Sequence, residues 1–386
     1  MRRRTQLRKP PFQQVTGLGR LSALDWIGLR LRGLRVSGSL VLGLGLVGVT
    51  LAAGGCSAGE AGGDGGAPSQ DDDGEPRNTF LDGSRLGDLP EKLSELGLRA
   101  DGAASGALHP SAHLYEPRFA LWSNGSDKER FISVPDGETI DTESEPWRFP
   151  LGTVFFKTFR FESSKYPTET RVSVITEQGA RFYAYQWDED GKDATLLDGR
   201  RAVRVAAEAD GNKFEHQIPS LLECRSCHES APSPVLGFDD LRLSSPLPGE
   251  AASQLEALEE EQLFSASPDL PELPADHEAD PLTLEILGYL EGNCVHCHNG
   301  GFGPSSAFDL RHDVALESLI GIETNSELLH GLRIDPGHPE TSAVFRALLA
   351  DPENAEEQAM PPLGVQLKDE AARDKFERWI NALDAE

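Results

Sequence analysis

Sulfur-containing residues are scarce in this sequence, which has five cysteines and two methionines among 386 residues. Four of the cysteines form two C-x-x-C pairs, and the fifth, Cys56, ends an apolar N-terminal stretch. Every cysteine therefore belongs to a pattern, and no spare thiol remains in the later part of the chain. Met1 begins the sequence, so only Met360 can provide a thioether in a processed chain.

Basic residues are also few, because 36 Lys and Arg stand against 64 Asp and Glu, which gives a formal net charge of -28. This acidity excludes nucleic acid as an expected partner, since phosphates would be repelled. Long apolar runs are missing as well. The longest covers about residues 39–53, short of the roughly 20 residues that a membrane-spanning helix needs. The length allows two domains, and a hydrophobic fraction of 38% is compatible with packed cores.

The N-terminal region has the composition of an export signal. Residues 1–35 are rich in Arg and Lys, residues 39–53 are apolar, and small residues precede Cys56. A cysteine in this position resembles the lipobox of bacterial lipoproteins, in which the sulfur is acylated and the signal is cleaved. We expect residues 1–55 to be removed and Cys56 to carry a lipid, or else an ordinary signal peptide with a nearby cut. Ser57 follows Cys56, which favours the outer membrane over the inner one.

The rest of the chain is predicted to be an α+β multidomain protein. Residues 56–78 are a flexible acidic tether of small and polar residues. Residues 79–245 are predicted to form a β-sandwich-like domain, because strand patterns with Gly and Pro punctuation run through 154–162, 170–176 and 181–187. Residues 246–281 are acidic and read as a linker, partly helical around 253–263.

Residues 282–386 are predicted to form a helical domain. Asp280 can cap a helix that has Pro281 in its first turn. Leu287, Leu290 and Cys294 then share one face at helical spacing. A second helix near the end places Phe376, Trp379, Ile380 and Leu383 at positions i, i+3, i+4 and i+7.

Each C-x-x-C pair is followed at once by histidine, in Cys224-Arg-Ser-Cys227-His228 and in Cys294-Val-His-Cys297-His298. One helical turn brings positions i, i+3 and i+4 to one face. Two thiols can then bond the vinyl groups of a haem, and the next histidine can bind its iron. C-x-x-C-H is the attachment signature of c-type haem. Zinc binding and disulfides are the alternatives, but neither needs a histidine after both pairs.

Local signals surround both motifs. Ser220 and Glu223 form a capping box, which predicts a helix that starts at Leu221 and carries the first motif. Met360, in a loop stiffened by two prolines, is the candidate sixth ligand of the second iron. Pro304 is a candidate neighbour behind His298. For the first iron, His216 is a candidate sixth ligand, with His109, His113 and His277 as others, or the position is open.

With these motifs the chain resembles bacterial di-haem c-type cytochromes that have a β-rich N-terminal region and a C-terminal cytochrome c domain. The resemblance runs from about Leu89 to the end. It depends on residues 150–159, 169–171, 184–187, 218–220, 235–238, 293–299 and 336–340 and on Met360-Pro361. It implies a class I-like cytochrome c domain, two covalently bound haem c groups and electron transfer.

Three functions remain open at this stage. The first is electron transfer between periplasmic redox partners, for which an acidic surface suits basic proteins. The second is a di-haem oxidoreductase or peroxidase, which needs one open haem iron. The third is a haem-based sensor or partner-binding module. The sixth position of the first haem distinguishes the first two.

Overall fold

The computed structural model describes residues 79–383, apart from residues 101, 103–105, 163, 269–279, 302–307, 352–353 and 355–357. The described residues all belong to one compact unit, Asp73–Glu386. The predicted signal peptide, Cys56, the tether, His277 and Pro304 lie outside the described residues. No helix in the described part of the chain is long and apolar enough to cross a membrane.

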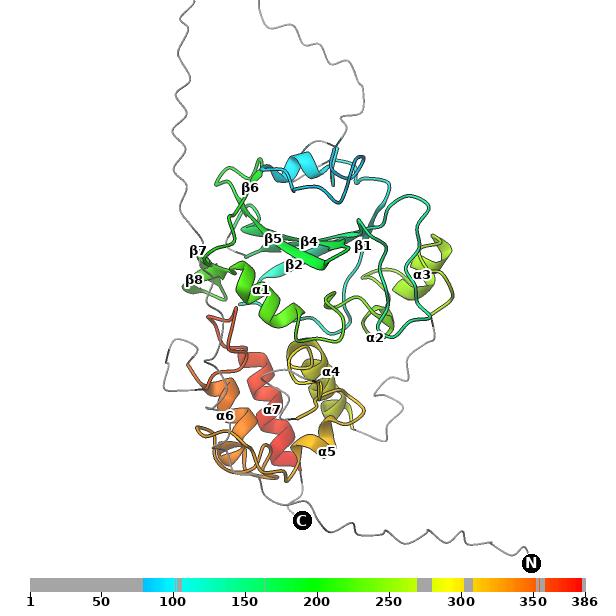
Figure 1. Ribbon diagram of the computed structural model, residues 1–386. Helices are drawn as coiled ribbons and strands as arrows, with labels where there is room; N and C mark the ends of the chain where they lie inside the picture. Colours follow the sequence, from blue (N-terminus) through cyan, green and yellow to red (C-terminus); the bar gives the residue numbers. More distant parts are fainter. Residues whose placement is uncertain are drawn as a thin grey trace, which may run out of the picture. The chain divides into compact units, whose positions relative to one another are not determined.

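A six-stranded antiparallel sheet occupies the first half of this unit, and its strands follow one another in sequence order (Figure 1). The strands are β1 (Ala112–Leu114), β2 (Asp127–Ser133), β3 (Val154–Arg160), β4 (Glu169–Thr176), β5 (Gly179–Trp187) and β6 (Ala194–Leu196). A separate hairpin pairs β7 (Val203–Ala209) with β8 (Asn212–Ile218). The three strands predicted from composition and alternation coincide with β3, β4 and β5.

Both faces of the large sheet are covered. One face, with Phe131, Phe156 and Tyr185, forms a core with the short 3-10 helix η1 (Leu93–Leu96). The other face, with Ile132 and Phe155, packs against α2 (Asp240–Leu243) and α3 (Gln254–Glu260). The predicted sandwich requires a second large sheet packed on the first. Among the described residues, loops and short helices cover the sheet instead. Alternation reports that a strand is buried, but not which element buries it.

The first part of the predicted linker packs against the sheet. Leu255 and Leu258 of α3, together with Leu263 and Phe264, lie in the second core. The Gln254 side chain accepts a hydrogen bond from the Glu116 backbone at 2.7 Å, which joins α3 to the strand region. Because its apolar side chains follow helical spacing, this acidic segment can bury one face and expose its carboxylates on the other.

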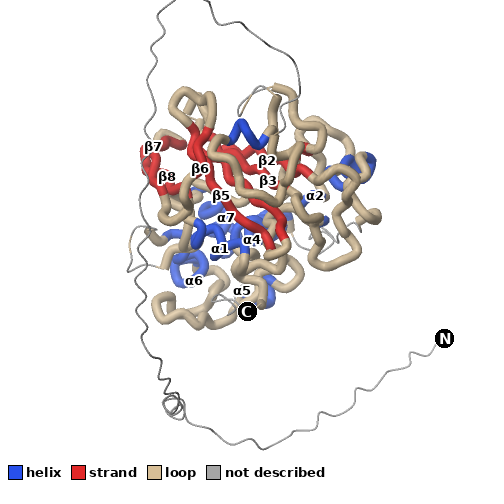
Figure 2. The backbone as a smooth tube through the Cα atoms, turned by 45° about the horizontal axis from the view of Figure 1, so that its top comes forward, coloured by secondary structure: helices blue, strands red, loops and turns tan. Residues whose placement is uncertain are grey.

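The C-terminal region is helical, with α4 (Pro281–Asn293), α5 (Ala315–Leu319), η3 (Pro339–Thr341), α6 (Ala343–Leu349) and α7 (Glu370–Ala382) (Figure 2). The Asp280 side chain caps α4, as predicted, by accepting hydrogen bonds from the backbone of Leu282 and Thr283. Phe376, Trp379 and Ile380 of α7 are buried against α4, which confirms the amphipathic helix predicted there. The mixed α+β class is therefore confirmed, with antiparallel sheets and helices.

Direct hydrogen bonds join the strand region to the helical region. The Trp122 backbone N–H donates to Asn293 Oδ1 at the end of α4, at 2.7 Å. Arg242 of α2 donates to the Glu291 carboxylate of α4 at 3.1 Å. Glu291 is buried and also accepts a hydrogen bond from the His312 backbone N–H. These contacts hold α4, which precedes the second motif, against the segments around the sheet.

Candidate cofactor-binding cavity

The first C-x-x-C-H motif lies on α1 (Leu221–His228), a helix that begins where the capping box predicts. The Ser220 backbone N–H donates to the Glu223 carboxylate at 2.8 Å, and the Glu223 backbone N–H donates to the Ser220 hydroxyl at 3.4 Å. These bonds satisfy groups that a helix start leaves unpaired. Cys224, Cys227 and His228 therefore lie on the last turns of a properly capped helix.

The second motif begins where α4 ends, with Cys294 as the residue that closes the helix. The backbone N–H groups of Cys297 and His298 both donate to the Cys294 carbonyl, at 3.1 and 2.8 Å. These bonds continue the chain for one more turn, so the second motif also has its two cysteines and its histidine on one turn. Cys294 packs partly buried against the helical core, as its predicted face requires.

His228 has a defined tautomer. Its Nδ1 lies 2.7 Å from the Pro234 carbonyl oxygen. Because a carbonyl can only accept, Nδ1 carries the proton and Nε2 keeps its lone pair. Burial lowers the pKa of His228 to about 4, so the ring is neutral, as a metal ligand must be. The Phe182 ring lies 4.5 Å away, between centroids, and supports the imidazole.

His298 is held by stacking. Its ring lies 4.5 Å from the Phe308 ring at an interplanar angle of 25°. The Arg333 guanidinium lies over the Phe308 ring at 4.4 Å. The His298 carbonyl also accepts a hydrogen bond from the Leu310 backbone. Pro304, the predicted neighbour behind His298, lies outside the described residues.

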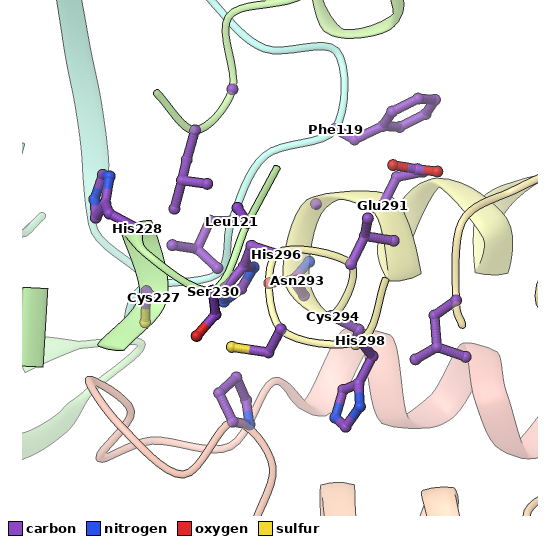
Figure 3. Close-up of a pocket in the computed structure, with 18 of the residues that line it drawn as sticks. Phe119, Leu121, Cys227, His228, Ser230, Glu291, Asn293, Cys294, His296 and His298 are labelled. Atoms are coloured by element: carbon purple, nitrogen blue, oxygen red, sulfur yellow. The ribbon is translucent and has the colours of Figure 1, made fainter. Parts of the chain in front are cut away.

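One cavity of about 1470 Å³ joins the two motifs. Figure 3 shows that Cys227, His228, Cys294, His296 and His298 surround it. A typical small-molecule pocket has about 300–1,000 Å³, so this cavity has room for more than one such ligand. The predicted site residues that line it are Cys224, Cys227, His228, Cys294, Cys297, His298 and Met360.

The two motifs are close neighbours. The side chain of Cys227 interacts with the Cys297 thiol and with His296. In the unmodified thiols, the interaction with Cys297 is the main cause that lowers the pKa of Cys227. His296 was expected to be a surface residue, but it is partly buried and lines the cavity. The spacing of a motif cannot show what its intervening residues meet in another segment.

Met360 lies in the cavity wall in a loop that the strand region holds in place. Its backbone N–H donates to the Ala347 carbonyl of α6 at 3.1 Å. Further along the same loop, Asn124 Oδ1 accepts hydrogen bonds from the backbone of Gln366 and Leu367, at 2.7 and 2.9 Å. Asn124 is fully buried and has a positive φ of 56°, which asparagine tolerates better than most residues. Sequence analysis missed Asn124, although the pair Asn124-Gly125 is a turn signal.

His216 does not line the cavity. Its side chain is 1% exposed, and its Nε2 lies 2.8 Å from Glu169 Oε1. Its ring packs against Phe161 at 4.9 Å. Burial alone would raise the pKa of Glu169, but the Arg171 guanidinium and the His216 hydrogen bond hold that pKa at about 2. The structure therefore makes His216 part of a buried polar cluster and does not bring it to the cavity as a ligand.

Zinc binding and disulfides are the alternatives for the cysteine pairs. In the described residues, no three His, Cys, Asp or Glu side chains gather as ligands of one metal ion, as a zinc site would need. Cys224, Cys227, Cys294 and Cys297 form no disulfide. A haem iron takes only one or two protein ligands, so its site does not need such a gathering.

Comparison of the chain with protein-family models, with curated proteins and with solved structures finds no match. The function is therefore inferred from the chemistry of the cavity and from the sequence motifs.

Proposed function

We propose that this chain is an exported, lipid-anchored di-haem c-type cytochrome that transfers electrons between periplasmic redox partners. The observation that carries the proposal is the meeting of two C-x-x-C-H turns, from distant parts of the chain, around one large cavity. A lipid on Cys56 would anchor the protein to the periplasmic side of the outer membrane. The helical region, residues 282–386, is proposed to be a cytochrome c domain.

The residues around the cavity fit two covalently bound haems. Cys224 and Cys227 would attach the first haem, and Cys294 and Cys297 the second. His228 offers Nε2 to iron, because Pro234 accepts the proton of Nδ1. His298 would have the same role in the second motif, and Met360 would provide a sulfur ligand. Bound haem supplies a reversible one-electron change at iron.

The contact between the motifs supports electron transfer through both haems. Because the side chain of Cys227 interacts with the Cys297 thiol, the groups attached to these two sulfurs become close neighbours. The protein around the cavity then needs only to hold the two haems and to limit the access of water to them. The net charge of -28 suits a basic partner at the surface.

A haem oxidoreductase is the second candidate. The placement of His216 favours it, because that side chain binds Glu169 and leaves the first motif without its predicted sixth ligand. Optical spectra of both redox states separate the two functions. Two low-spin haems favour electron transfer, and a high-spin signal from the first haem favours the enzyme.

A denaturing gel stained for covalent haem tests the proposal. We expect two haems in the wild type, one in Cys224→Ala/Cys227→Ala and one in Cys294→Ala/Cys297→Ala. Cys56→Ser is the matched control, since its thiol lies in neither motif and two haems should remain. Bound zinc in place of haem, or no haem that survives denaturation, would overturn the proposal.

A further inference from the structure

Three cationic side chains face each other across three neighbouring strands. Arg130 on β2 is directly paired with Lys157 on β3, and Lys157 is directly paired with Arg171 on β4. Side chains in such a row are about 4.5–5.5 Å apart at Cβ, and like charges there are destabilising. This arrangement is unexpected in a chain with a net charge of -28, where acidic residues are plentiful. We call Arg130, Lys157 and Arg171 the cationic row.

Protein carboxylates neutralise only part of the cationic row. Glu169 pairs with Arg171, at 2.6 Å between Oε1 and Nη2, and shares the same oxygen with His216. Arg130 is only 5% exposed, and its side chain donates to the Lys128 carbonyl at 3.5 Å. The Lys157 ammonium lies over the Phe159 ring at 5.1 Å. Within the described part of the chain, neither Arg130 nor Lys157 forms an ion pair with a carboxylate.

All three residues line the cavity beside the first motif. The next row on the same face of the sheet pairs Phe155 with Ser173 and Ser173 with Phe182, and Phe182 contacts the His228 ring. The charges of Lys157 and Arg171 act on His228, and that of Arg171 also acts on Cys224. The cationic row therefore belongs to the wall next to α1.

The energetics point to a missing negative charge. Burial and the neighbouring cations Arg130, Lys128 and Arg171 lower the pKa of Lys157 well below its ordinary value. A buried cation such as Arg130 is costly without a partner, and an anion held by it and by Lys157 removes that cost. Guanidinium and ammonium groups that converge on one space are the donors that carboxylates and other oxyanions prefer.

We propose that the cationic row binds a carboxylate or another small oxyanion inside the cavity, next to the first C-x-x-C-H motif. The inference deepens the proposed function and rests on it for one of its two possible sources. The oxyanion is either a propionate carboxylate of the first haem or a small anionic substrate that enters the cavity. Both sources place negative charge between Arg130 and Lys157.

The test compares Lys157→Gln and Arg130→Gln with two controls that remove the same charges from exposed positions. Lys192→Gln and Arg160→Gln are suitable, because Lys192 lies in the β5–β6 turn and Arg160 is exposed at the end of β3. Lys157→Arg keeps the charge and should restore the wild-type behaviour. Covalent haem is counted in the wild type and in every variant. Absence of covalent haem from the wild type would contradict the proposed function, independently of the anion measurements.

Two measurements distinguish the sources. Ferric protein is titrated with sodium acetate and with sodium nitrite. Binding of the anion is measured from the change in the Soret band and by calorimetry. A free anion predicts saturable binding that is about tenfold weaker in Lys157→Gln. If the oxyanion is a haem propionate, the added anions should show no saturable binding. Lys157→Gln should then shift the propionate band in the resonance Raman spectrum. It should also change the reduction equilibrium of the first haem tenfold, which is about 59 mV for one electron.

Either result supports the oxyanion site. The proposal is wrong if Lys157→Gln and Arg130→Gln match their exposed controls in anion affinity, in the propionate band and in the midpoint potential of the first haem. Should one of the two glutamine variants fail to fold, Lys157→Arg and the remaining variant still decide the outcome, since charge and not shape is what the site requires.

Discussion

At the scale of single residues, substitution of Met360 is the sharpest test of the proposed second haem site. We expect Met360→Ala to lower the midpoint potential of the C-terminal haem, because a thioether favours ferrous iron. The fall should be on the order of 0.1 V, within the roughly 0.8 V range that axial ligands cover. A redox titration measures it, and the iron should become high-spin.

The exposed Leu328 does not line the cavity and provides the control, and Leu328→Ala should leave the potential unchanged. The first haem should respond little to either substitution. If the sulfur–iron absorption band and both potentials survive in Met360→Ala, Met360 is only a packing residue.

Glu169 predicts a dependence of stability on pH. Its pKa of about 2 lies below its ordinary value of 4.5, because Arg171 and His216 stabilise the carboxylate against the effect of burial. A lowered folded-state pKa stabilises the fold above the unfolded value, so this stability is present above about pH 4.5 and is lost as the pH falls toward about 2. The contribution is about 3 kcal/mol at most.

Denaturant unfolding at pH 7 and pH 3 should therefore show a smaller pH effect in Glu169→Gln than in the wild type. The exposed Glu177 lies in the turn after the same strand, and Glu177→Gln serves as the control. An equal loss of stability on acidification in all three proteins would show that Glu169 is not the group responsible.

At the scale of elements, Asn124 should control the loop that carries Met360. Asn124→Ala leaves the backbone N–H groups of Gln366 and Leu367 without their acceptor, at a cost of about 1–3 kcal/mol. We expect a partial loss of the sulfur–iron absorption band and a fall in the potential of the second haem, with two haems still attached.

Asn124→Asp keeps the accepting oxygen and should restore much of the band. Asn212→Ala, at the exposed first position of β8, should have no effect. If Asn124→Ala loses the expected stability but keeps the sulfur–iron absorption band unchanged, Asn124 has only a structural role.

At the scale of the whole molecule, the proposed lipid anchor at Cys56 would determine where the protein is found. Cys56→Ser should move the protein from the membrane fraction to the soluble fraction, or leave it unprocessed, because no other anchor is predicted. Cell fractionation and immunoblotting measure this, with Ser57→Ala as the control that keeps the thiol. Membrane association that persists in Cys56→Ser contradicts the lipoprotein prediction.

Local patterns predicted much of the fold. The capping box of Ser220 and Glu223 predicted the start of α1, and Asp280 with Pro281 predicted the start of α4. The spacing of Phe376, Trp379 and Ile380 predicted the buried face of α7. These signals arise from residues within four positions of each other, so the sequence alone contains them.

Only the tertiary structure decided which distant residues meet. It joined the two C-x-x-C-H turns through Cys227 and Cys297, and it placed His216 with Glu169, away from the cavity. It also aligned Arg130, Lys157 and Arg171 through the register of three strands. Strand register and contacts between segments come from packing of the whole chain, and no short stretch of sequence specifies them.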